Sequence, residues 1–100
     1  MEGKSKEKSV TLIVPILHLN GTSKQELVQL RCQAYRALDK AIEALKNMAP
    51  HGRDYYPVPG LLTKAQEQHL RRLKALADVQ AELEEEVIQL DQINNGERHG

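Results

Sequence analysis

The residues best suited to bind a ligand lie in the short segment that separates two long helical patterns. Arg53 carries a planar guanidinium that can hold a phosphate through two parallel hydrogen bonds, and Asp54 adds a carboxylate. Tyr55 and Tyr56 supply rings that can stack on a base or hydrogen-bond a ribose. These residue types predict a site for a nucleotide-type anion. In the alternative interpretation, the tyrosines close the end of a hairpin and Arg53 pairs with Asp54.

A second candidate site is the turn Asn20-Gly21-Thr22-Ser23, which directly precedes a helical pattern. The free amides and the positive dipole end of a helix N-terminus can hold a phosphate or a carboxylate. The hydroxyls of Thr22 and Ser23 would add donors. Turns of this composition also cap helices without binding a ligand, so both interpretations stay open.

Arg31 lies at the angular centre of the apolar face of the first helical pattern. A guanidinium there must be paired, reach an edge or meet an anion, because a buried unpaired charge is costly. Gln66, His69 and Gln80 interrupt the apolar stripe of the second pattern, and Gln80 is expected to face Arg31. These residues predict either an internal hydrogen-bond network, possible also at a subunit interface, or a polar pocket that closes on an anionic ligand.

The elements that must position these residues are two long amphipathic helices. Ser23 to Glu26 and Thr63 to Gln66 both fit the capping box that begins a helix, and Pro50 follows the first pattern. The predicted fold is all-α, a long antiparallel helical hairpin with a short N-terminal extended or β segment, completed by oligomerisation. The predicted single domain spans residues 10–95. It comprises an extended arm at 10–19, a helix at 24–48, a loop at 49–60 and a helix at 62–93. The N-terminus at 1–9 and the tail at 96–100 are predicted to be disordered.

The arm reads Val-Thr-Leu-Ile-Val-Pro-Ile-Leu over residues 10–17, and its apolar residues alternate with the period of a strand. Pro15 cannot donate to a strand ladder, so the segment is predicted to be an edge strand or an extended packing arm. No other segment offers a convincing second strand. The arm is therefore expected to pair with another subunit or to lie along the helices.

The relative length of the two helices predicts how they pair. Symmetric pairing across the loop sets Leu45 near Gln66 and Leu27 near Leu83. On this register the end of the second helix, residues 87–93, overhangs its partner. Two helices alone also leave their apolar stripes half covered, since helical bundles usually contain three or four. We therefore predict a homo-oligomer.

The composition disfavours several classes of function. Fourteen basic and fourteen acidic residues balance and are mixed along both helices, which disfavours nucleic-acid and membrane partners. The apolar run at 10–19 is too short to span a bilayer, and the single Cys32 fits a reducing compartment, so a cytoplasmic location is expected. The sequence contains no Walker loop, no paired Cys or His ligand set and no nucleophile triad, so it predicts no enzyme, no cofactor and no metal site.

Two segments of the chain, His18-Leu19-Asn20-Gly21-Thr22-Ser23 and Gly52-Arg53-Asp54-Tyr55-Tyr56-Pro57, resemble small proteins of phages and prophages. The resemblance covers residues from about 10 to 92. The general plan also resembles phage anti-defence sponges, small helical oligomers that sequester cyclic oligonucleotide or cyclic ADP-ribose immune signals. The resemblance implies binding of phosphates and bases between subunits, and a location in the host cytoplasm. It assigns no individual residue of this chain.

The sequence as a whole predicts a non-enzymatic oligomeric protein that sequesters a small anionic, nucleotide-type ligand. The alternative is a protein-interaction module, for instance a phage inhibitor that docks a host protein through its helices. The predicted ligand-binding residues are Asn20, Gly21, Thr22, Ser23, Arg31, Arg53, Asp54, Tyr55 and Tyr56. The two loops lie at opposite ends of one hairpin, about 37 Å apart for a helix of about 25 residues. A site that uses both loops therefore requires an oligomer.

Overall fold

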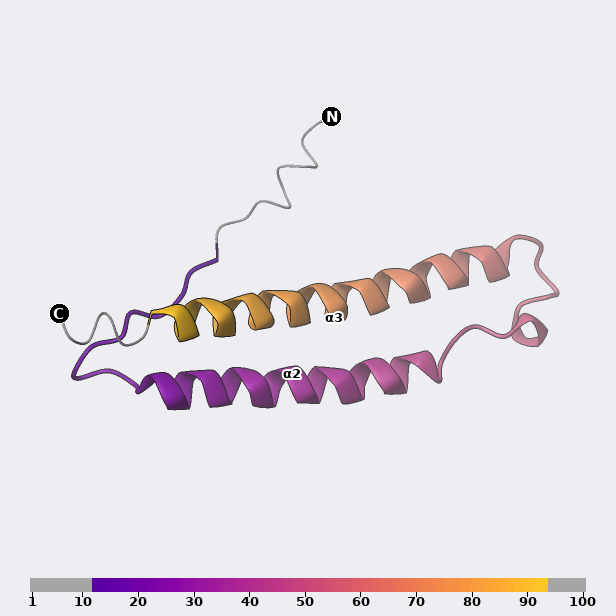
Figure 1. The fold of residues 1–100 in the computed structure, drawn as a ribbon. Helices are drawn as coiled ribbons and strands as arrows, with labels where there is room; N and C mark the ends of the chain where they lie inside the picture. Colours follow the sequence, from indigo (N-terminus) through magenta and orange to yellow (C-terminus); the bar gives the residue numbers. More distant parts are fainter. Residues whose placement is uncertain (1–11, 94–100) are drawn as a thin grey trace, which may run out of the picture.

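The computed structural model describes residues 12–93, which form two antiparallel helices packed against each other (Figure 1). Helix α2 spans Lys24–Lys46 and helix α3 spans Leu61–Gln92, with a short 3-10 helix, η1, at Gly52–Asp54 in the loop between them. The prediction of an all-α hairpin is confirmed, and the predicted helix ends differ from the observed ones by at most two residues. Predictions that concern residues 1–11 and 94–100 lie outside the described residues.

Local signals fix where α2 begins, but they mislead at the start of α3. Ser23 caps α2, and its Oγ accepts a hydrogen bond from the Glu26 amide at 3.1 Å, as the capping box predicts. The capping box predicted at Thr63 is wrong, because α3 already begins at Leu61. Its N-cap is Gly60, whose φ of 84° lies in the left-handed region that favours glycine.

The arm before α2 contains no strand among the described residues. Residues 12–18 lack regular secondary structure and pass beside the C-terminal end of α3 (Figure 1). Val14 and Leu17 are half-buried there, whereas Ile13 and Ile16 are more than four-fifths exposed. The strand-like alternation breaks at Pro15, which is itself half-buried. The prediction of an extended packing arm fits this segment, and the edge strand is not formed within residues 12–93.

Three contacts between the helices define their register. Lys24 Nζ lies 3.6 Å from Asp91 Oδ1, Arg31 Nε lies 2.7 Å from Glu86 Oε1, and the Gln80 amide donates to Tyr35 O at 3.1 Å. The first turn of α2 is therefore level with the last turn of α3.

The predicted pairings of Leu45 with Gln66 and of Leu27 with Leu83 are wrong by about five residues along α3. The chain reverses late in the loop, where the Leu61 amide donates to Val58 O at 3.1 Å and Gly60 adopts a positive φ. The extra length of α3 therefore lies at its start, beside the loop. Gly52 packs near Leu62 there, since a Cβ added at Gly52 would lie 3.9 Å from Leu62 Cδ2. Residues 87–93 do not overhang α2.

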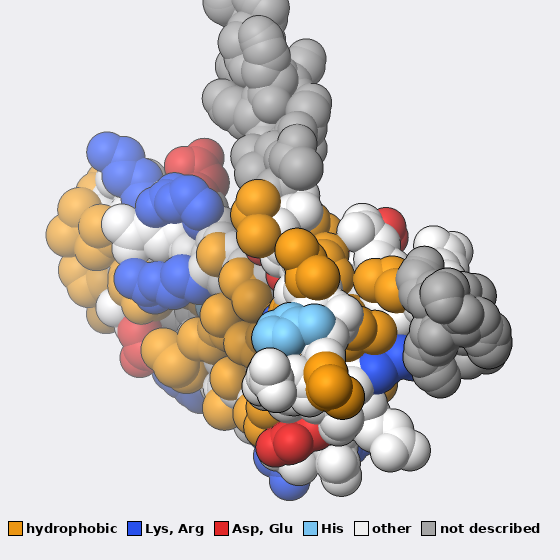
Figure 2. All heavy atoms as spheres, turned by 90° about the vertical axis from the view of Figure 1, so that its left-hand side faces the viewer, with side chains coloured by type: hydrophobic (Ala, Val, Ile, Leu, Met, Phe, Trp, Pro, Cys, Tyr) orange, Lys and Arg blue, Asp and Glu red, His pale blue; other side chains and the backbone are white. Residues whose placement is uncertain are grey.

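The hairpin has almost no hydrophobic core of its own within residues 12–93. Leu90 is the single buried hydrophobic residue there, and the other two buried residues, His69 and Gln80, are polar. Eleven large hydrophobic side chains are exposed, and Figure 2 shows hydrophobic groups gathered over the end of the molecule that carries the arm. Such surfaces are typical of a chain that packs against another chain.

In the part of the chain that the structure describes, no helix has both the length and the hydrophobicity to cross a membrane.

Candidate ligand-binding residues at the two ends of the hairpin

The turn before α2 presents polar groups to solvent. Asn20, Thr22 and Ser23 are exposed, and the Gly21 amide donates to His18 O at 3.1 Å, which closes a tight turn. The His18 imidazole lies across this turn, since a Cβ built on Gly21 would stand 2.7 Å from His18 Nε2. The absence of a side chain at Gly21 therefore lets His18 pack over the turn. We did not select His18 as a binding residue from the sequence, although its place three residues before a glycine is typical of such turns.

The loop between the helices presents its candidate residues in and just after η1. The Asp54 amide donates to His51 O at 2.9 Å, and the Tyr55 amide donates to Gly52 O at 3.0 Å, which holds the short 3-10 turn. His51 Nδ1 also accepts from the Arg53 amide at 3.3 Å. The backbone of the loop is therefore fixed by its own hydrogen bonds.

The side chains of this loop divide into one that packs and three that face solvent. Tyr55 is half-buried, whereas Arg53, Asp54 and Tyr56 are exposed, Tyr56 by 79%. Within residues 12–93 the Arg53 guanidinium has no ion pair and no hydrogen bond, so the alternative in which it pairs with Asp54 is not observed. The loop offers a cation, a carboxylate and an aromatic ring on a short, hydrogen-bonded frame.

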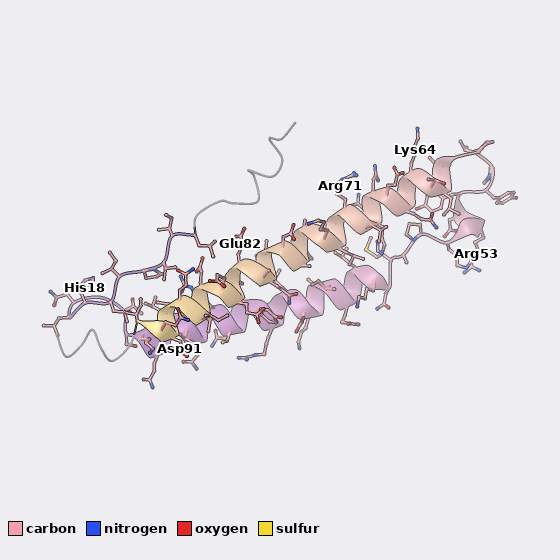
Figure 3. The ribbon with its side chains drawn as sticks, turned by 45° about the horizontal axis from the view of Figure 1, so that its top comes forward. His18, Arg53, Lys64, Arg71, Glu82 and Asp91 are labelled. Carbon is pink, nitrogen blue, oxygen red and sulfur yellow. The ribbon has the colours of Figure 1, made fainter. Side chains whose placement is uncertain are left out.

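The turn and the loop lie at opposite ends of the molecule, as the positions of His18 and Arg53 show in Figure 3. Lys24 is level with Asp91, and Gly52 is level with Leu62. The 29 helical steps from Leu62 to Asp91, at about 1.5 Å each, separate the two ends by about 44 Å. The separation exceeds the predicted 37 Å because the loop runs on past the end of α2. The structure therefore does not bring the two groups of predicted residues together in one chain.

Arg31 lies between the helices and makes two hydrogen bonds there. Its Nε donates to Glu86 Oε1 at 2.7 Å, and its Nη1 donates to Leu27 O at 3.1 Å. The Arg31 and Glu86 side chains are 20% and 17% exposed. The interpretation of an internal network describes this residue. Glu86 was missed because it stands in the acidic run Glu84 to Glu86, and only the register of the helices turns it toward α2.

Gln80 takes part in a separate network, so the expectation that it faces Arg31 is wrong. Its amide nitrogen donates to Tyr35 O at 3.1 Å and to Asp39 Oδ1 at 2.9 Å. The register places Gln80 one turn of α2 beyond Arg31. His69 is buried closer to the loop, whereas Gln66 is exposed. No buried side-chain nitrogen or oxygen within residues 12–93 lacks a hydrogen-bond partner.

Two open grooves flank α3, and neither contains the loop residues. A groove of about 340 Å³ between the helices is mostly apolar, and its charged residues include Arg31, Arg36 and Glu84. A shallower groove of about 880 Å³ separates the arm from the C-terminal end of α3. Within residues 12–93 no three His, Cys, Asp or Glu side chains gather in a way that could hold a metal ion.

Comparisons of the chain with models of known protein families, with curated proteins and with solved structures found no match.

Proposed function

We propose that this chain is a non-enzymatic oligomeric binding protein that sequesters a small anionic, nucleotide-type ligand, as a phage anti-defence sponge does for a host immune signal in the host cytoplasm. The observation that carries the proposal is the contrast between a paired arginine, Arg31, and an exposed arginine, Arg53. Arg31 is paired with Glu86, whereas Arg53 is exposed and has no partner within residues 12–93, and the exposed Tyr56 follows it in the same loop. A loop that exposes both a guanidinium and an aromatic ring fits a ligand in which a phosphate is joined to a base.

Each polar group has a defined role in the proposed site. Arg53 holds a phosphate, and Tyr56 stacks on a base, while Tyr55 packs and supports the loop. Asp54 accepts hydrogen bonds from ribose hydroxyls or base amino groups. The turn Asn20-Gly21-Thr22-Ser23 supplies amides and hydroxyls to a second phosphate. Arg31 has no part in this site because its guanidinium already meets Glu86 and Leu27 O.

The assembly is a necessary part of this proposal. A single chain holds the turn and the loop about 44 Å apart, which no small ligand can bridge. A second chain that runs antiparallel can set its loop beside the turn of the first. The eleven exposed hydrophobic side chains support an association of this kind.

The second candidate function is a protein-interaction module that docks a host protein. The exposed hydrophobic residues of the helices, among them Leu30, Leu70 and Ile88, favour it because they could also contact an unrelated protein. The two functions differ in one respect that can be measured. A module of this kind has no need of a small ligand or of the Arg53 guanidinium.

Native mass spectrometry of the full chain, with and without cyclic dinucleotides, cyclic trinucleotides and cyclic ADP-ribose, tests the proposal. We expect an assembly that gains a discrete ligand mass, released unchanged on denaturation. Arg53→Ala should lose this mass and keep the assembly, whereas Arg71→Ala, another exposed arginine, serves as the matched control and should keep both. An assembly that binds none of these compounds would favour the protein-interaction module. A ligand released with an altered mass would indicate an enzyme.

A further inference from the structure

A continuous apolar stripe of exposed residues runs along α2 and into the turn that follows it. Its spacing alternates between four and three residues, which keeps the five members within α2 on one face of the helix, and the sixth, Met48, lies in the turn just after the helix ends at Lys46. Every member is exposed in the structure, including Leu30 at 51% and Met48 at 60%. We call this set the outer stripe of α2: Leu30, Ala34, Ala37, Ala41, Ala44 and Met48.

The outer stripe is distinct from the face that α2 packs against α3. Arg31 and Tyr35 make contacts with α3, and at 100° per residue the outer stripe is centred about 100° from Arg31 and about 140° from Tyr35. Alanine alone is a common residue of exposed helices. Here, however, no polar residue interrupts six successive positions, and both end positions carry large hydrophobic side chains. The stripe therefore has the composition of a helix–helix contact with no partner in this chain.

The printed sequence outside the hairpin offers few apolar residues that could cover the stripe. Residues 1–11 and 94–100 contain Met1 and Val10 as their only large apolar residues. The arm at residues 12–17 is placed against the far end of α3. Within residues 12–93 no segment covers the outer stripe, which is therefore open to a second molecule.

The pattern of the stripe identifies that molecule as a second copy of the chain. The stripe is nearly a palindrome about Asp39, because Leu30 then matches Met48, Ala34 matches Ala44 and Ala37 matches Ala41. A two-fold axis requires a self-complementary surface of this kind. Two helices that cross at about 20° are closest at the crossing point, where alanine fits, and diverge toward their ends, where larger side chains fill the gap. We propose that two copies pack α2 against α2 in antiparallel orientation through the outer stripe, with the two-fold axis near Asp39.

This packing has a consequence for the candidate site, which rests on the proposed function. Ser23 lies about 24 Å from the level of Asp39 along α2, at about 1.5 Å per residue. The register of the helices puts Gly52 and Leu62 about 22 Å from Asp39 on the other side. The axis therefore brings the Arg53 loop of the partner to the level of the turn at Asn20 to Ser23. The pairing that the stripe indicates completes the site that one chain leaves in two halves.

The interface can be tested without any ligand, so its failure is distinguishable from failure of the proposed function. Ala37→Glu combined with Ala41→Glu sets like charges against each other in the pair and should reduce the mass in solution, measured by light scattering, while circular dichroism keeps its helical signal. The matched control is Ala77→Glu with Ala81→Glu on α3, two exposed alanines of the same spacing, which should keep the assembly. The double variant Ala37→Lys with Ala41→Glu should restore it, because residue 37 then meets residue 41 with opposite charge.

Two results would overturn the proposal. An unchanged mass for the Ala37→Glu and Ala41→Glu variant would show that the outer stripe is not an interface. A lower mass that the Lys and Glu combination fails to restore would exclude the antiparallel pairing about Asp39, since a parallel pair sets the two introduced lysines against each other. If the α3 control also loses mass, the Ala37→Lys and Ala41→Glu variant still decides. A restored mass supports the antiparallel pairing, and a mass that stays low excludes it.

Discussion

The region between the helices around Arg31 and the loop around Arg53 use the same side chain in opposite ways. Arg31 meets Glu86 at 2.7 Å and is four-fifths buried, whereas Arg53 is exposed and has no partner within residues 12–93. The first arginine therefore belongs to the packing of the two helices. The second remains available to an anion. The difference indicates that partner and burial, rather than residue type, separate the structural arginine from the candidate binding arginine in this hairpin.

The largest expected effect comes from breaking the pair between the helices. Arg31→Ala should lower the free energy of unfolding by about 2–3 kcal/mol, because it leaves the Glu86 carboxylate mostly buried without its partner. Arg31→Met with Glu86→Leu should recover most of this loss, since no charge is then left unpaired. Urea unfolding followed by circular dichroism measures both. A double variant no more stable than Arg31→Ala would show that the unpaired Glu86 carboxylate is not the cause of the loss.

The next effect concerns the loop and sharpens the difference between its two tyrosines. Tyr56→Ala should weaken binding of a cyclic dinucleotide by about 1–2 kcal/mol, roughly fivefold to thirtyfold, through loss of stacking on a base. Stability should stay within about 0.5 kcal/mol because the ring is exposed. Tyr55→Ala should instead lower stability, because that ring is half-buried. Isothermal titration and thermal unfolding separate the two, and equal behaviour of the two variants would contradict their division of roles.

A smaller effect is expected at the turn before α2. Gly21→Ala would place a Cβ 2.7 Å from His18 Nε2, so the imidazole must move away. The cost in stability should be no more than about 0.5 kcal/mol, because His18 is an exposed, flexible side chain. Nuclear magnetic resonance should detect a changed environment of the His18 ring. An unchanged His18 spectrum would mean that the ring does not lie across the turn in solution.

The smallest expected effect is on the dissociation constant of the proposed pair, and it comes from a residue beside the outer stripe of α2. Lys40 adjoins Ala37 and Ala44 on the helix surface, so antiparallel pairing about Asp39 brings it near Lys40 of the partner subunit. Lys40→Gln should tighten the pair by about 0.3–0.5 kcal/mol, roughly twofold in the dissociation constant, by removing one like-charge contact. Analytical ultracentrifugation measures this, with Lys64→Gln as the control at the start of α3. Weaker association of the Lys40→Gln variant would argue against this placement of the axis.

The local parts of the fold could be predicted from the sequence, whereas its register could not. Ser23 and Glu26 predict the start of α2, because a helix cap depends on residues that are neighbours in the chain. The pairing of Arg31 with Glu86 depends on how the loop reverses the chain, and that is decided at Gly60. The predicted pairing is symmetric about the loop, whereas the chain reverses late in it. Every contact predicted from that pairing is therefore displaced by about five residues along α3.

The sequence singles out the candidate residues by their type, but it does not show which of them are paired and which are exposed. The sequence identified Arg31 and Arg53 equally well, because both residues combine a guanidinium with an unusual setting. Only the structure distinguishes the paired one from the exposed one. The palindrome of the outer stripe was present in the sequence as well. The structure adds that all six residues are exposed and that the five within α2 lie on a different face from the residues that hydrogen-bond to α3.

The central claim is that an antiparallel neighbour brings together two ends that one chain holds about 44 Å apart. The most direct measurement is chemical cross-linking of a Thr22→Cys and Arg53→Cys variant with a short bismaleimide, in a background where Cys32→Ser removes the natural thiol. We expect a covalent dimer from the double variant and much less from either cysteine alone. A double variant that stays monomeric on a denaturing gel, under conditions where the protein is assembled, would contradict the shared site.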